Sequence, residues 1–264
     1  MFDQRCQNQI FNLVKGVDRS TINNVYHVSE FCSDIHQNML SHESQWNPNP
    51  TYMSRQEKIE ETIRSKLIDW LIHIHYNFKL LPETLFLTVN VIDRYFSVTQ
   101  ISKRDVQLVG IAALLITTKY EEIYPPILKD FVYITENEYT GDEILDMEKK
   151  ILFALDFDLN LCSPLRFLER FNKLGKICDV TWYLSQYMLE LGLLDSKMSQ
   201  FNPSLQAVAA IYTAKKYLNM HNSEISQPSS FMLNDYNVTW TMDQVKSCAQ
   251  CFNQLATLIY KSKL

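Results

Sequence analysis

The chain has 264 residues, of which 46% are hydrophobic and 21% are charged, and its formal net charge is −5. This length suits one large domain or two smaller ones, and the acidic balance argues against a protein that binds nucleic-acid phosphates. Only five glycines occur and no apolar run approaches the length of a membrane span, so the composition favours a soluble helical protein over a many-stranded β protein or a membrane protein.

The first 51 residues are predicted to form an N-terminal segment with one amphipathic helix. Apolar residues recur at helical spacing between Tyr26 and Leu40. The prolines of Trp46–Pro50 end this pattern, because proline lacks an amide donor and disfavours helix in the residue before it. Residues 1–24 are polar, weakly patterned and without a secretory signal. We therefore expect an intracellular protein whose first domain begins after residue 51.

Residues 52–161, the first unit, are predicted to contain five helices. Three of them are expected to begin at Ser/Thr-x-x-Asp/Glu patterns, which cap helix N-termini: Ser54-x-x-Glu57, Ser102-x-x-Asp105 and Thr140-x-x-Glu143. Helical periodicity and proline breaks place the five over about 54–78, 82–96, 102–123, 127–132 and 140–155. The third is apolar nearly all round, which predicts that it is surrounded by the others.

Residues 162–264, the second unit, show a similar order of long and short helices. Start signals occur at Ser163-Pro164, Asn202-Pro203 and Thr241-x-x-Gln244. The expected helices cover about 164–174, 179–194, 203–219, 228–236 and 241–260. The third is rich in alanine, as a central helix can be. The sequence therefore predicts two copies of one five-helix unit.

Enzymatic and metal-binding patterns are missing from the sequence. Neither a phosphate-binding loop of the type G-x-x-x-x-G-K-S/T nor a G-x-S-x-G hydrolase turn occurs. Cys248 and Cys251 form a C-x-x-C without a second ligand pair at zinc spacing. The six cysteines are scattered, which favours buried, reduced thiols over disulfides. We therefore expect no catalytic residues, no cofactor and no metal site.

Five strings on these helices together resemble the cyclin box. They are IRSKLIDWL at 63–71, VIDRYF at 91–96, ITTKYEEIYPP at 116–126, FVYIT at 131–135 and MEKKIL at 147–152. The likeness covers roughly residues 25–262 and is strongest to A- and B-type mitotic cyclins, B-type above all. It implies an all-α fold of two tandem five-helix cyclin-box domains preceded by an N-terminal helix.

The resemblance also implies a function. Cyclins bind a cyclin-dependent serine/threonine kinase and activate it by positioning its C-helix and activation loop, and perform no chemistry themselves. Lys119 and Glu148 match the family's paired contacts to the kinase backbone, although ordinary solvated charges are the alternative. Apolar residues around them match the rest of the kinase surface, with plain core residues as the alternative: Ile116, Tyr120, Leu152, Phe157 and Leu159.

Two further family sites have matching residues. Arg64 and Asp93 match a buried ion pair that joins the first two helices of the first unit. Ile63, Leu67, Trp70 and Gln107 match an apolar patch that docks Arg-x-Leu motifs of substrates and inhibitors. Lys66 and His73 depart from that patch, because an aliphatic residue is usual at the first position and the second is acidic in some members of the family. A lysine can repel the motif's arginine, so weakened or altered docking is expected.

Alternative functions remain for the same fold. One is a transcriptional cyclin or related transcription factor, and another is a helical adaptor that binds proteins without activating a kinase. The preferred prediction is a cell-cycle kinase regulator of nucleus and cytoplasm, with no direct contact to nucleic acid or membrane. Residues 1–24 hold no Arg-x-x-Leu degradation signal.

Overall fold

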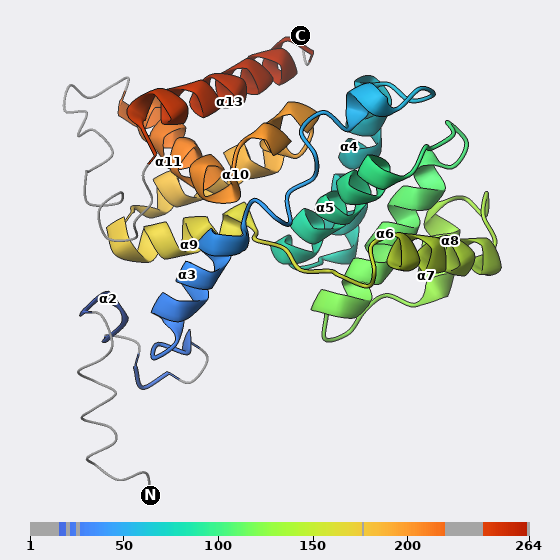
Figure 1. The fold of residues 1–264 in the computed structure, drawn as a ribbon, viewed down its shortest axis with the longest axis horizontal. Coiled ribbons are helices and arrows are strands. Elements are labelled where there is room, and N and C mark those ends of the chain that lie inside the picture. Colours follow the sequence, from blue (N-terminus) through green and yellow to red (C-terminus); the bar gives the residue numbers. More distant parts are fainter. Residues whose placement is uncertain (1–15, 20–21, 25–26, 176, 220–239, 263–264) are drawn as a thin grey trace, which may run out of the picture.

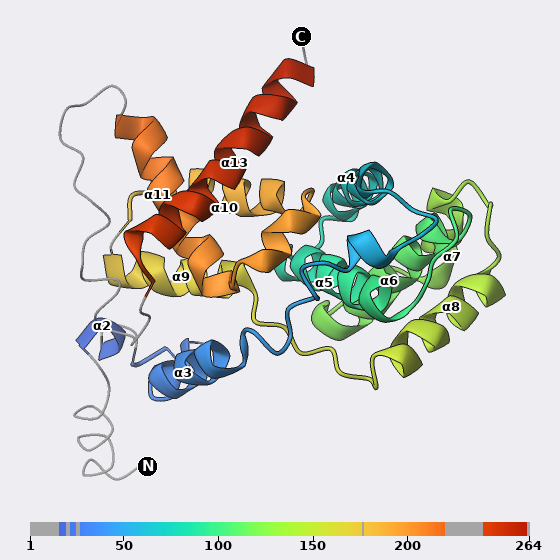
Figure 2. The same ribbon diagram turned by 45° about the horizontal axis from the view of Figure 1, so that its top comes forward.

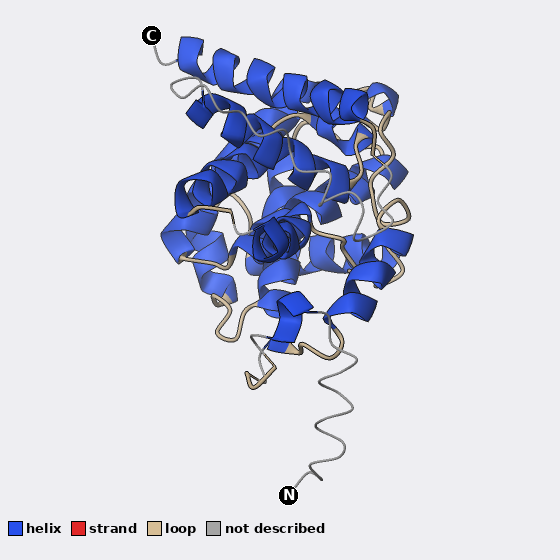
Figure 3. Ribbon diagram, turned by 90° about the vertical axis from the view of Figure 1, so that its left-hand side faces the viewer, coloured by secondary structure: helices blue, strands red, loops and turns tan. Residues whose placement is uncertain are grey.

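The computed structural model describes residues 16–19, 22–24, 27–175, 177–219 and 240–262 of the chain. Helices, turns and loops account for all of these ranges, and no strand occurs in them (Figure 1, Figure 3). Two groups of helices lie side by side, and α3 (Cys32–His42) lies against the second group (Figure 1). The predicted all-α fold with two helical units is confirmed.

The first unit is arranged around α6. Its helices are α4 (Glu61–Phe78), α5 (Pro82–Val98), α6 (Val106–Glu121), α7 (Leu128–Ile134) and α8 (Gly141–Ala154). Every residue of α6 from Val109 to Thr118 is buried, and α4, α5 and α8 pack around it (Figure 2). The prediction that the most apolar helix is central is confirmed, because a helix covered on all sides needs no polar face.

A glycine sets the spacing between α4 and α6. A Cβ atom at Gly110 would lie 2.7 Å from Leu67 Cδ1, a separation that carbon atoms do not tolerate. Glycine therefore allows α6 to approach α4 closely at this point. The approach buries Leu67, which is 5% exposed.

The second unit repeats this arrangement around α11 (Pro203–Asn219). Packed against it are α9 (Pro164–Gly175), α10 (Asp179–Gly192) and α13 (Met242–Ser262). Ala207, Ala209 and Ala210 on α11 are fully buried, since small side chains let neighbouring helices approach it. A short 3-10 helix, η3 (Ser196–Gln200), joins α10 to α11. The predicted short helix over 228–236 lies outside the described residues.

The observed N-termini of the helices agree with some of the predicted caps and not with others. Thr140 caps α8 as predicted: its Oγ1 accepts from the Glu143 amide, and its own amide donates to Glu143 Oε2 at 2.8 Å. Ser54 does not cap α4, because its hydroxyl donates to the Thr51 carbonyl within η2 (Met53–Arg55). Gln56 then holds the chain extended by donating to the carbonyl oxygens of Phe96 and Thr99. As a result α4 begins only at Glu61.

Two more start signals, Ser102 and Thr241, also differ in outcome. Ser102 donates its hydroxyl to Asp105 Oδ2 at 2.7 Å, so it caps no amide, and α6 begins after Asp105. Thr241 accepts from the Gln244 amide at 3.3 Å, and its own amide donates to Gln244 Oε1. The capping prediction was therefore wrong for the third helix and is confirmed for the last.

Thr140→Ala is expected to lower the free energy of unfolding by about 1 kcal/mol, because the Glu143 amide loses its acceptor. Ser54→Ala is the matched control, since that hydroxyl lies in an exposed turn and caps no helix; its effect should stay within about 0.5 kcal/mol. Urea denaturation followed by circular dichroism measures both. Equal losses in the two variants would contradict the assigned caps.

The N-terminal segment is tied to the second unit. Its helix α3 begins at Cys32 rather than near Tyr26, and the His36 ring lies edge-on to Phe167, with ring centres 5.2 Å apart. A short helix that the sequence did not predict, α2 (Gly16–Arg19), buries Asp18 against Arg170 and Lys173 of α9. Burial alone would raise the pKa of Asp18, but hydrogen bonds and charge from the two cations outweigh it and lower that pKa.

Candidate functional site

Lys119 and Glu148 meet on the outer surface of the first unit. Lys119 lies in the last turn of α6 and Glu148 in the middle of α8, two helices that pack against each other. The ammonium donates to both carboxylate oxygens, at 2.7 Å and 2.8 Å. The Lys119 side chain is 47% exposed and that of Glu148 13%. The pair is thus open to solvent on one side, and a third N–H of the ammonium is left for another acceptor.

Exposed aromatic rings lie on the same two helices as this ion pair and in the turn after α8. Tyr120 follows Lys119 directly and is 58% exposed. Phe157 is 59% exposed although it is apolar, and its ring packs edge-on against Phe153, with centres 5.3 Å apart. Asp156 and Phe157 both adopt the left-handed region, with φ of 51° and 58°. Two consecutive non-glycine residues rarely occupy that region, so the turn holds Phe157 outward at a conformational cost.

The remaining predicted contact residues lie deeper. Ile116 is only 3% exposed and belongs to the core of the first unit. Leu152 and Leu159 are half-buried and pack against the same core. These three side chains therefore belong to the core or pack against it, whereas Lys119, Tyr120 and Phe157 are exposed.

Sequence reasoning missed several other exposed apolar side chains of the first unit. The stretch that links α6 to α7 and α7 itself expose four of them: Ile123, Tyr124, Ile127 and Tyr133. Phe153 on α8 is a fifth. The helices concerned, α6, α7 and α8, pack against one another, and large exposed apolar side chains that gather on neighbouring elements mark an interaction surface. The signal in the sequence was the pair of prolines at 125–126, which ends α6 and leaves the flanking residues without a helix to cover them.

The predicted docking patch lies on the outer side of α4 and the start of α6. Ile63, Trp70 and Gln107 are half-buried, whereas Leu67 is buried beneath them. Lys66 and His73, the two residues that differ from the family's pattern in this patch, are both exposed. The His73 ring lies 4.0 Å from Asp69, one turn earlier on the same helix. The surface thus carries an ammonium and an imidazole next to its half-buried apolar side chains.

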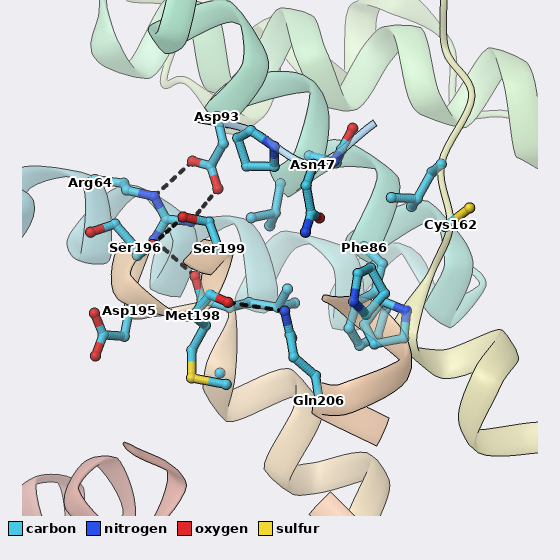
Figure 4. Close-up of a pocket in the computed structure, with 18 residues that line it drawn as sticks. Asn47, Arg64, Phe86, Asp93, Cys162, Asp195, Ser196, Met198, Ser199 and Gln206 are labelled. Carbon is cyan, nitrogen blue, oxygen red and sulfur yellow. Dashed lines mark hydrogen bonds and ion pairs between the residues drawn. The ribbon is translucent and has the colours of Figure 1, made fainter. Parts of the chain in front are cut away.

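Arg64 and Asp93 form a buried pair between α4 and α5. Two hydrogen bonds of 2.7 Å join the guanidinium to the two carboxylate oxygens (Figure 4). The Tyr52 hydroxyl donates to Asp93 Oδ1 at 2.6 Å. Burial alone would lower the pKa of Arg64, but the charge and hydrogen bonds of Asp93 outweigh burial and raise it. Burial and the Asp93 charge raise the pKa of Tyr52, so its hydroxyl keeps its proton and remains a donor.

The same arginine also links the two units. Arg64 Nη1 donates to the Leu193 carbonyl oxygen at 2.9 Å. The hydroxyl of Ser65 donates to the Leu194 carbonyl oxygen at 2.7 Å. Both carbonyls lie directly after α10. The sequence indicated the partner within the first unit but not these contacts, because they join residues far apart in the chain.

The described part of the chain offers no metal site and no membrane-spanning helix. No group of three or more His, Cys, Asp or Glu side chains there could hold a metal ion. No helix among those residues is both long enough and apolar enough to cross a membrane. Cys248 is buried and burial raises the pKa of its thiol, but Cys178 is exposed, so the expectation of buried cysteines was wrong for that residue.

Two family models match the chain almost end to end. The model of the cyclin N-terminal domain matches residues 34–160, and that of the cyclin C-terminal domain matches residues 162–264. Among solved structures, a viral cyclin from herpesvirus saimiri superposes with a TM-score of 0.72 at 18% identity, over 83% of this chain and 95% of that one. At this identity the likeness shows the shared fold.

Curated relatives are closer in sequence. The G2/mitotic-specific cyclin cdc13 of Schizosaccharomyces pombe is 44% identical over 72% of this chain and 40% of its own length. The G2/mitotic-specific cyclin-B of Marthasterias glacialis is 43% identical over 78% of this chain and 54% of its own. The chain thus spans about half the length of these relatives. With both family models matched in order, the chain belongs to the cyclin family and resembles its B-type mitotic members.

Proposed function

We propose that this chain is the regulatory subunit of a cyclin-dependent serine/threonine kinase in cell-cycle control, which it binds and activates. The observation that carries the proposal is the Lys119–Glu148 pair, which is open to solvent on two helices that also expose Tyr120 and Phe153. The mitotic names of its relatives agree with it. In this role the chain performs no catalysis and acts in the nucleus and cytoplasm. Its first unit, residues 52–161, holds the kinase and its second, residues 162–264, packs beside the first.

The mechanism follows from the chemistry of this surface. When the kinase C-helix docks, Tyr120, Phe157 and the rings around them lose contact with water, and this desolvation provides most of the binding energy. Lys119 can then donate to backbone carbonyl oxygens of the kinase, while Glu148 accepts from its amides. Holding the C-helix inward forms the Lys–Glu ion pair of the kinase and orders its activation loop, which completes the phosphoryl-transfer site.

Histone phosphorylation by a purified mitotic-type cyclin-dependent kinase tests the proposal directly. The kinase alone should be nearly inactive, and addition of this chain should raise the rate by orders of magnitude, as expected when a site is assembled on binding. The chain alone should show no turnover. Binding without activation would contradict the proposal and favour a helical adaptor. Activation only of a kinase that phosphorylates RNA polymerase would favour a transcriptional cyclin.

Lys66→Ile should strengthen the binding of an Arg-x-Leu peptide to the patch on α4. The exposed ammonium of Lys66 repels the peptide's arginine, and an isoleucine would remove that charge and add apolar surface beside Ile63 and Trp70. Removal of one exposed like-charge contact is expected to tighten binding roughly fivefold. Fluorescence polarisation with a labelled peptide measures the change.

Lys216→Ile serves as the control, because Lys216 is also exposed but lies on α11 of the second unit. It should leave peptide binding unchanged. Ordinary micromolar binding by the unmodified chain, with no gain in Lys66→Ile, would show that this lysine does not weaken docking.

A further inference from the structure

The turn that follows α8 has an unusual backbone. The Phe157 amide donates to the Leu152 carbonyl oxygen at 2.9 Å, and the Asp156 amide donates to that of Phe153 at 3.3 Å. Two bonds of this kind close a helix as a Schellman motif, in which glycine usually fills the left-handed position. Here Asp156 and Phe157 fill that position and the next, with φ of 51° and 58°. The turn is therefore strained, and contacts with the rest of the fold have to keep it in place.

Arg94 on α5 provides such contacts. Its Nη2 lies 3.6 Å from Asp158 Oδ2, and its Nη1 donates to the Asn160 carbonyl oxygen at 3.4 Å. Asp158 and Asn160 are the first and third residues after Phe157. The Arg94 side chain is 15% exposed, so water and salt screen its attraction to Asp158 less than they screen a surface pair. Arg94 therefore ties the segment that leaves the turn to α5.

Hydrogen bonds within this segment connect Arg94 to the turn itself. Asp158 Oδ1 accepts from the amide and the Nδ2 of Asn160, at 3.0 Å and 2.8 Å, and the Asp158 amide donates to the Leu155 carbonyl oxygen at 2.9 Å. Leu155 is buried and Leu159 packs against the core of the first unit. Among the described residues, Arg94 is the one side chain of another helix that forms a hydrogen bond or an ion pair with this segment. The leucines thus fix the segment through apolar contacts, and Arg94 fixes it through polar ones.

The conformation of the turn determines where the Phe157 side chain lies. Its ring is 59% exposed and meets the Phe153 ring edge-on, with centres 5.3 Å apart. A return of φ to negative values at Asp156 or Phe157 would break the two amide bonds of the motif and change the direction of the ring. The place of this exposed ring therefore depends on the contacts that hold the turn.

We propose that Arg94 is a positioning residue for kinase binding, which acts through Phe157 and does not itself contact the kinase. This inference rests on the proposed function, in which Phe157 belongs to the kinase-binding surface. A turn that is already held in its bound conformation leaves less to be ordered on docking, so loss of Arg94 weakens affinity. Activation at saturating chain concentration should persist, because Lys119 and Glu148 are unchanged.

A double-mutant cycle in the affinity of the full chain for a mitotic-type cyclin-dependent kinase tests the proposal. By titration calorimetry, Arg94→Met should raise the Kd roughly fivefold and Phe157→Ala roughly 30-fold. In the Phe157→Ala background, Arg94→Met should change the Kd by less than about twofold, since the ring through which it acts is gone. An equal loss in both backgrounds would show that Arg94 acts without Phe157 and would overturn the proposal.

Two further variants separate positioning from a general loss of stability. Asp156→Gly should restore part of the affinity that Arg94→Met loses, because glycine adopts positive φ without strain. Thr241→Ala removes a helix cap in the second unit and should leave kinase affinity unchanged. A loss of affinity in Thr241→Ala equal to that in Arg94→Met would show that lowered stability alone explains the effect.

NMR spectra of the free chain distinguish a failure of this proposal from a failure of the proposed function. Cross-peaks between the Phe153 and Phe157 rings should weaken in Arg94→Met and return in Arg94→Met/Asp156→Gly. Unchanged cross-peaks in Arg94→Met, with kinase binding of the unmodified chain intact, would overturn the positioning role alone. Failure of the unmodified chain to bind a cyclin-dependent kinase would overturn the proposed function and, with it, the role of Arg94 in kinase binding.

Discussion

Asp93→Ala is expected to lower the free energy of unfolding by about 3 to 5 kcal/mol, one of the largest losses that any single substitution in this chain should cause. The carboxylate accepts two hydrogen bonds from Arg64 and one from Tyr52, all three buried. Its removal leaves a guanidinium with 2% side-chain exposure and no counter-ion. Urea denaturation at pH 7 measures the loss, and kinase binding should weaken in the same variant because α4 and α5 are joined by this pair.

Asp146→Ala is the matched control for this prediction. Asp146 forms an ion pair of 3.2 Å with Lys149 on α8, and both side chains are exposed. An exposed pair of this kind contributes less than about 1 kcal/mol. The double variant Arg64→Met/Asp93→Leu should recover part of the loss, because replacing both members leaves no buried charge behind. A melting temperature of Asp93→Ala equal to that of the unmodified chain would contradict the role assigned to the pair.

The double variant Lys119→Ala/Glu148→Ala should lose kinase activation while keeping its fold. Central polar contacts within an apolar surface commonly change affinity by about 30-fold or more when truncated. The pair itself adds little to stability, since Lys119 is half exposed. The measurement is the histone phosphorylation rate as a function of chain concentration, together with a urea denaturation curve for each protein.

Asp146→Ala/Lys149→Ala provides the control on the same helix. It also removes an ion pair of α8, but one that lies on the opposite side of the helix from the core-packed residues. This variant should activate the kinase as the unmodified chain does. If both double variants activate equally, the α6–α8 surface does not hold the kinase and the interface must lie elsewhere.

Most helices could be predicted because their signals are local. Periodic apolar residues and prolines lie within a few positions of one another, and they gave the order and approximate ends of α4 through α11. The predicted helix ends were less accurate where a side chain near the end binds a residue far away in the sequence. Gln56 binds carbonyl oxygens at the end of α5, so the residues after Ser54 stay extended instead of joining α4. Neither carbonyl has a local signal in the sequence.

In the candidate site, too, some features could be predicted from the sequence and others could not. Lys119 and Glu148 were found through a family resemblance, and the structure places them 2.7 Å apart. The exposure of Phe153 could not be predicted, because an apolar residue on an amphipathic helix normally faces the core. Asp18 was overlooked for the opposite reason: its partners, Arg170 and Lys173, lie about 150 positions away, and nothing near Asp18 in the sequence indicates burial.

The order of the contacts around Arg64 has a consequence for how the chain folds during its synthesis. The partners that neutralise and satisfy the guanidinium, Tyr52 and Asp93, leave the ribosome with the first unit. The Leu193 carbonyl emerges about 100 residues later. The nascent first unit can therefore close its core with its buried cation already paired, as domains folding from the N-terminus require. The later contact with Leu193 then serves to dock a second unit onto a finished first one.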